Sequence, residues 1–100
     1  MKGLFTKVDK DFILKHVSEE EIFEKYMQTR IYPGVMYRSV LRHDKRPTCS
    51  FIYTKGKLKM KDFNGSFFDD CFAFVQAKFG IGYHEAIQQI AGDFKLTTRK

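Results

Sequence analysis

Residues 49–63 read C-S-F-I-Y-T-K-G-K-L-K-M-K-D-F, two alternating runs on either side of Lys55-Gly56. Glycine accepts the positive φ of a tight turn, so this stretch predicts a β-hairpin with a two-residue loop. In that register Thr54 faces Lys57 and Phe51 faces Met60. One face of the hairpin is then apolar, and it consists of Phe51, Tyr53, Leu58 and Met60. The other face consists of Ser50, Ile52, Thr54, Lys57, Lys59 and Lys61.

Three lysines at alternate positions, Lys57, Lys59 and Lys61, form what we call the lysine row. Same-face neighbours on a strand are about 6 to 7 Å apart, close to the phosphate spacing of a nucleic-acid strand. The lysine row therefore predicts phosphate contacts. A structural explanation stays open beside this one, because lysines on an edge strand also prevent aggregation.

Positive charge is concentrated in the same part of the chain. The 100 residues contain 18 Lys and Arg against 12 Asp and Glu, for a net charge of +6. Residues 38–62 hold eight basic and two acidic side chains, so the net charge of this segment, +6, equals the net charge of the whole chain. Such a local excess is typical of a polyanion binder, because bound phosphates release their counterions. The alternative is a surface that only increases solubility.

The candidate nucleic-acid contacts come from this segment and the residue before it. Tyr37 and an exposed Ile52 are candidates for packing against a base. The candidate phosphate contacts are Arg38, Arg42, Lys45, Arg46, Lys55, Lys57, Lys59 and Lys61.

Helices are expected on both sides of the hairpin. Asp9 predicts the cap of a short helix that runs to about Val17. Ser18 and Glu21 form a capping box for a second helix, which we expect Pro33-Gly34 to end. A third helix is expected from about Asp69 to Gly80 and a fourth from about Tyr83 to Phe94.

The apolar residues of these helices recur at helical spacing, and we assign them to the core, not to base stacking. They are Ile22, Phe23, Tyr26 and Met27 in the second helix, Phe68, Phe72, Val75 and Phe79 in the third, and Tyr83, Ile87, Ile90 and Phe94 in the fourth. The predicted fold class is α+β, a small antiparallel hairpin or sheet flanked by about four helices. We expect one domain over residues 1–100, with 1–17 as a helical extension and 95–100 as a frayed basic tail.

Neither catalysis nor metal binding is predicted from the residues. Cys49 and Cys71 form no C-x-x-C pair, and the three histidines are far apart in the sequence. We find no acid pair, no nucleophile with a base and no phosphate loop, so we expect a non-enzyme without a cofactor. No signal peptide is visible and no apolar run approaches the roughly 20 residues of a membrane span, so the expected location is the cytoplasm.

Three segments together resemble the zinc-binding domain of bacterial and phage DNA primases. They are Ser39–Phe51 (S-V-L-R-H-D-K-R-P-T-C-S-F), the hairpin that follows, and Asp70–Ala91 (D-C-F-A-F-V-Q-A-K-F-G-I-G-Y-H-E-A-I-Q-Q-I-A). The resemblance covers about residues 18–94, and its shared frame consists of Pro47, Phe74-Val75 and Glu85-Ala86. It implies a zinc-ribbon-like sheet.

The metal ligands of that family are missing from this chain. Ser39 and Arg42 stand where the family has its first Cys and its His, and Met60 and Phe63 stand where it has its C-x-x-C pair. These residues cannot hold zinc together. We therefore expect a zinc-free domain in which Met60 and Phe63 form an apolar plug in place of the metal.

In that family the module contacts the single-stranded template beside a separate polymerising domain, for which this chain has no room. The resemblance thus implies a single-stranded DNA-binding accessory subunit that partners a separate primase or polymerase catalytic subunit in replication priming, as encoded by a mobile element or phage. A rival interpretation from another class is an interaction protein, such as a phage-encoded inhibitor, that binds an acidic protein partner through the basic hairpin.

Overall fold

The hairpin forms in the register that the sequence predicts. In the computed structural model, which describes residues 8–39, 41, 47–63 and 67–96, β1 (Cys49–Thr54) pairs antiparallel with β2 (Lys57–Asp62). Phe51 lies opposite Met60 and Thr54 opposite Lys57. Lys55 and Gly56 both have positive φ, 53° and 78°, as in the type I′ turn that matches the twist of a hairpin.

A short third strand, β3 (Phe68–Asp69), extends the sheet on the β2 side, so the strand order is β1-β2-β3. Lys61 pairs with Phe68, and Met60 pairs with Asp69. This strand includes Asp69, where we predicted that the third helix begins. The helix begins only at Cys71, because the Asp70 side chain accepts a hydrogen bond from the Ala73 N–H at 3.0 Å and caps it.

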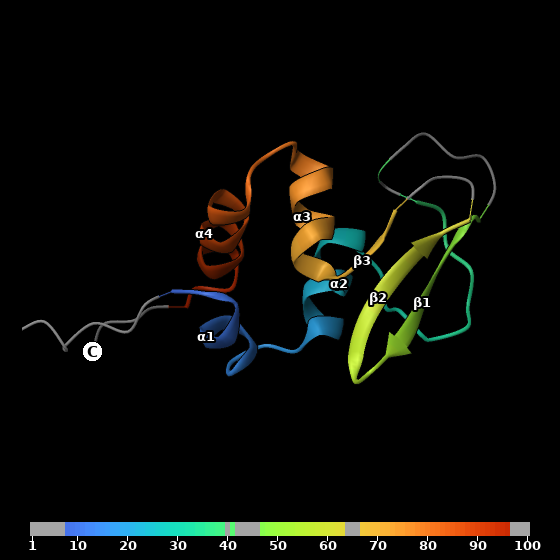
Figure 1. Cartoon of the computed structure of the whole chain (residues 1–100), viewed down its shortest axis with the longest axis horizontal. Helices are drawn as coiled ribbons and strands as arrows, with labels where there is room; N and C mark the ends of the chain where they lie inside the picture. Colours follow the sequence, from blue (N-terminus) through green and yellow to red (C-terminus); the bar gives the residue numbers. More distant parts are fainter. Residues whose placement is uncertain (1–7, 40, 42–46, 64–66, 97–100) are drawn as a thin grey trace, which may run out of the picture.

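Four helices are present in the described residues: α1 (Lys10–Leu14), α2 (Glu19–Met27), α3 (Cys71–Phe79) and α4 (Tyr83–Asp93). Figure 1 shows the sheet at one end of the molecule and α1 and α4 at the other, with α2 and α3 between them. The predicted α+β class with about four helices is confirmed, and the antiparallel sheet has three strands. None of these helices is long and apolar enough to cross a membrane.

The first two helices begin where their caps predict. Asp9 accepts a hydrogen bond from the Phe12 N–H at 2.9 Å, and the capping box between Ser18 and Glu21 is complete. The predicted end of α2 was wrong. The helix stops at Met27 because Gln28 adopts the left-handed conformation, with φ of 62°, well before Pro33.

Three phenylalanine rings join the helices to the sheet. The Phe23 ring of α2 lies 4.9 Å from the Phe51 ring of β1 and 5.3 Å from the Phe74 ring of α3, measured between centroids, and all three are buried. The apolar hairpin face therefore packs on α2 and α3, which leaves the lysine face turned away from this contact. This arrangement positions the candidate site.

Some predicted core residues are instead on the surface. Phe68, Phe79 and Tyr83 are 46%, 42% and 46% exposed. Their helical spacing led us to assign them to the core. Phe68 instead belongs to a strand, and Phe79 and Tyr83 lie at the two helix ends joined by the α3–α4 turn. Cys71 is buried, and burial raises the pKa of its thiol above the ordinary value.

Candidate nucleic-acid interface

The lysine row lies on the outward face of β2. Lys57 and Lys61 are exposed and Lys59 is half-buried. In the described part of the chain the ion pairs are Lys10 with Asp70 and Arg30 with Glu24, so none involves the lysine row. Within that part of the chain, these three ammonium groups are therefore candidates for contact with an external anion.

The remaining candidates are distributed around the hairpin. Lys55 is exposed in the turn, and Arg38 is exposed beyond Tyr37. Ser50 shares a face with the lysine row but is buried, so this face is not open along its whole length. Arg42, Lys45 and Arg46 lie outside the described residues.

Tyr37 has partners that fix it beside the hairpin. Its hydroxyl accepts a hydrogen bond from the Tyr32 N–H at 2.7 Å, and its ring packs edge-on against Phe51, with 5.6 Å between centroids. Its backbone forms an isolated antiparallel bridge with Cys49. These contacts give Tyr37 a structural role in holding residues 32–37 along β1. Ile52, the other residue considered for base contact, is half-buried.

Two exposed phenylalanines, which we call the aromatic pair, lie at one end of the lysine row. Phe63 is 56% exposed, and Phe68 of β3 is 46% exposed. The Lys61 ammonium lies 5.2 Å from the Phe63 centroid and 5.9 Å from the Phe68 centroid. The Lys59 ammonium lies 5.4 Å from the Phe68 centroid. Cations at such distances are attracted to the negative face of the ring.

Sequence reasoning assigned both members of the aromatic pair to other roles. Phe63 continues the alternation of positions 57, 59 and 61, and this signal would have placed it on the lysine face. Phe68 fits the helical spacing of Phe72, Val75 and Phe79 by coincidence. The capping preference of Asp70 was the signal that the helix begins after Phe68.

The four positions that the sequence resemblance aligned with zinc ligands do not suit zinc. Ser39 is buried and its hydroxyl accepts a hydrogen bond from the Leu41 N–H at 3.1 Å, while Met60 is fully buried in the core. Phe63 points into solvent, so the prediction that it forms an apolar plug with Met60 was wrong. Arg42 lies outside the described residues, and within them no three His, Cys, Asp or Glu side chains group as metal ligands would.

Two acidic residues of α2 bond to the hairpin, Glu20 through a side chain on the face opposite the lysine row and Glu19 through a backbone N–H of β2. Glu19 accepts a hydrogen bond from the Leu58 N–H at 3.1 Å, and Glu20 accepts one from the Tyr53 hydroxyl at 2.6 Å. The hydrogen bond to Glu20 is the main cause that raises the pKa of Tyr53 to about 12. Glu20 therefore lies on the face of the hairpin opposite the lysine row.

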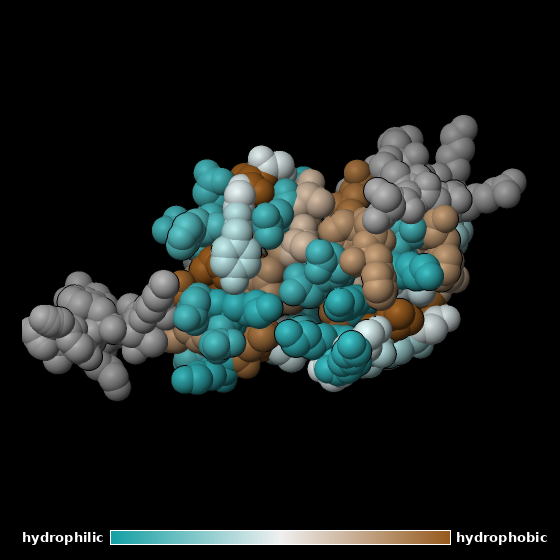
Figure 2. Space-filling model, viewed as in Figure 1, coloured by the Kyte–Doolittle hydropathy of each residue, from teal (hydrophilic) through white to brown (hydrophobic). Residues whose placement is uncertain are grey.

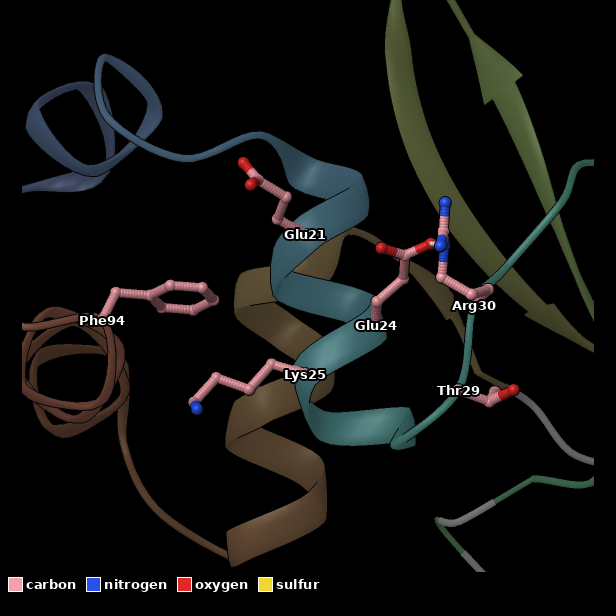
Figure 3. A pocket seen from close by; sticks show the side chains of 6 residues that line it. All are labelled: Glu21, Glu24, Lys25, Thr29, Arg30 and Phe94. Carbon is pink, nitrogen blue, oxygen red and sulfur yellow. Dashed lines mark ion pairs between the residues drawn. The ribbon is translucent and has the colours of Figure 1, made fainter.

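An open hollow of about 510 Å³ lies at the surface of α2. Figure 3 shows its lining, in which Glu24 pairs with Arg30 and Lys25 extends from α2 on the side of Phe94. Glu24 also accepts a hydrogen bond from the Ile31 N–H at 3.0 Å. Charges of both signs meet and neutralise one another there, so this hollow lacks the excess of one sign that a polyanion site needs.

No protein-family model matches this chain, and the comparisons with curated proteins and with solved structures gave no match either. The functional assignment therefore depends on the chemistry of the residues just described.

Proposed function

We propose that this chain is a single-stranded DNA-binding accessory subunit that works beside a separate primase or polymerase catalytic subunit. The observation that carries the proposal is the lysine row, which presents ammonium groups at every second position of β2 without carboxylate partners in the described residues. Its spacing suits successive phosphates of one extended strand.

The dipolar charge distribution supports the same proposal. Residues 38–62 carry the net positive charge of the chain, whereas Glu20 of α2 bonds to Tyr53 on the hairpin face opposite the lysine row and Glu19 bonds to the Leu58 N–H. A strand that approaches the lysine row meets cations first and is not repelled by these carboxylates.

The role beside a catalytic subunit comes from the resemblance to primase zinc-binding domains. In this proposal the chain binds template and supplies no catalytic group, and the polymerising active site belongs to its partner. The zinc of the family has no counterpart in the proposal, because a buried serine and a core methionine are poor zinc ligands.

The test is a fluorescence-anisotropy titration of a labelled oligothymidylate at low ionic strength, repeated with poly-glutamate as competitor. A nucleic-acid site should bind the oligonucleotide and hold it against an equal concentration of competing carboxylates. If poly-glutamate displaces the oligonucleotide completely at equal charge, the acidic-protein interpretation takes its place. Co-purification with a polymerase-like subunit encoded beside this chain tests the partner, and its failure with any such subunit would remove that part of the proposal.

A further inference from the structure

The aromatic pair needs an explanation that the lysine row does not provide. Phe63 and Phe68 each expose about half of their surface, although the core takes up Phe23, Phe51 and Phe74 completely. Phosphate binding requires cations but no rings. Figure 2 shows that hydrophobic side chains reach the surface over the sheet end of the molecule, next to hydrophilic ones.

The geometry puts rings and ammonium groups on the same face of the sheet. Phe68 lies directly opposite Lys61 in the β2–β3 register, and Phe63 follows Lys61 by two residues. The ammonium groups of Lys59 and Lys61 lie less than 6 Å from ring centroids of the aromatic pair. A ligand that covers either ring must therefore also meet a positive charge.

We propose that the aromatic pair stacks on unpaired bases of the strand whose phosphates bind the lysine row. This inference rests on the proposed function and deepens it, because it states what part of the nucleic acid is recognised. Binders of single strands combine a basic surface along the backbone with aromatic rings on which successive bases stack. A base in a duplex already stacks on its neighbours, so the pair selects single strands over duplex.

An apolar protein surface is a poorer occupant of the same face. Covering Phe68 would bury the ammonium groups of Lys59 and Lys61 with it, and an apolar partner offers no anion to pair with them. Lysine is accordingly depleted at the centres of protein interfaces. A nucleotide satisfies both groups, because its base covers the ring and its phosphate meets the ammonium.

Recognition by stacking also predicts the kind of specificity. Every base has a π face, so the aromatic pair should tolerate any sequence and should not depend on base-edge hydrogen bonds. The backbone contributes charge and the bases contribute apolar contact, and these two contributions can be separated experimentally.

The experiment compares three labelled ligands of equal length: oligothymidylate, an abasic oligonucleotide with the same phosphates, and a duplex. Wild type should bind oligothymidylate more tightly than the abasic strand, by roughly 5- to 160-fold for each stacked base. The double variant Phe63→Ala/Phe68→Ala should lose that difference and keep the salt dependence of binding to the abasic strand. Circular dichroism establishes that the variant is folded.

Phe79→Ala is the matched control. Phe79 is 42% exposed and has the Lys78 ammonium 5.5 Å from its centroid, but it ends α3, away from the sheet. This variant should bind all three ligands as wild type does. An equal loss in the control would mean that any exposed phenylalanine affects binding, which overturns the assignment.

The outcomes separate this inference from the function on which it rests. If wild type binds oligothymidylate and the abasic strand equally tightly, with salt-sensitive affinity for both, the stacking role is wrong and the phosphate site stands. If wild type binds none of the ligands at low ionic strength, both are wrong. The wild-type comparison needs no variant, so the inference is tested even where the double variant does not fold.

Discussion

At the scale of single residues, alternation along β2 separates structural from functional side chains. Leu58 and Met60 are buried against the helices, and the lysine row lies on the other face. Phe63 belongs to the outward series although its chemistry suits the core. The alternation of side chains between the two faces of the strand therefore decides whether a residue is buried here, and its hydrophobicity alone does not.

The contact between Tyr53 and Glu20 predicts a pH effect. Only the protonated phenol can donate this hydrogen bond, so the pKa of Tyr53 rises from its ordinary value of 10.0 to about 12. The contribution to stability is complete below pH 10 and is lost as the pH rises through 12. Titration followed by tyrosinate absorbance should show a late-titrating tyrosine that moves toward 10 in Glu20→Ala. An unchanged titration curve in that variant would contradict the assignment.

At the scale of elements, the α2 cap can be tested without touching the sheet. Ser18→Ala removes the oxygen that accepts a hydrogen bond from the Glu21 N–H at 3.0 Å. We expect the free energy of unfolding to fall by about 0.5 to 2 kcal/mol in urea denaturation. Ser18→Thr keeps the acceptor and is the control. Oligonucleotide affinity should not change, and a large loss in folded Ser18→Ala would place the binding site on the helices.

The sequence predicted the elements that local chemistry specifies. The hairpin register follows from alternation and from Gly56, and the start of α2 follows from its capping box. The end of α2 could not be predicted, because Gln28 is an uncommon residue in the left-handed conformation and Pro33-Gly34 is the stronger stop signal. Strand β3 was hidden because two residues show no periodicity, and packing on β2 decides their structure.

The candidate site was predictable to the extent that it follows from the hairpin. The lysine row could be placed because all three lysines occupy alternate positions of one strand and therefore lie on the same face. The aromatic pair could not be assembled, because Phe68 reaches Lys61 only through the pairing of β3 with β2. That contact is tertiary, and neither residue indicates it in the sequence.

At the scale of the whole molecule, we expect the protein to fold without metal. Three phenylalanine rings from α2, β1 and α3 connect the elements through apolar contact, and Met60, which the sequence resemblance aligned with a zinc ligand, is fully buried. A chelator should leave the circular dichroism spectrum and the melting temperature unchanged. Stoichiometric zinc in elemental analysis, or unfolding by the chelator, would show that the protein depends on a metal.

The central claim is that the lysine row binds the phosphates of a single strand, and the salt dependence of oligonucleotide binding tests it most directly. If about four to six cations each neutralise one phosphate, the slope of log K against log salt should be about −3 to −4 for a single strand. Replacing Lys57, Lys59 and Lys61 together by alanine should reduce that slope by about two units.

The matched control replaces Lys15, Lys25 and Lys78 together by alanine, which removes the same charge from three positions outside the sheet. Our account predicts a slope close to that of wild type for the control and a much shallower slope for the lysine-row variant, with both proteins folded. It is contradicted if the two triple variants give the same slope, or if wild type shows no salt-sensitive binding to a single strand.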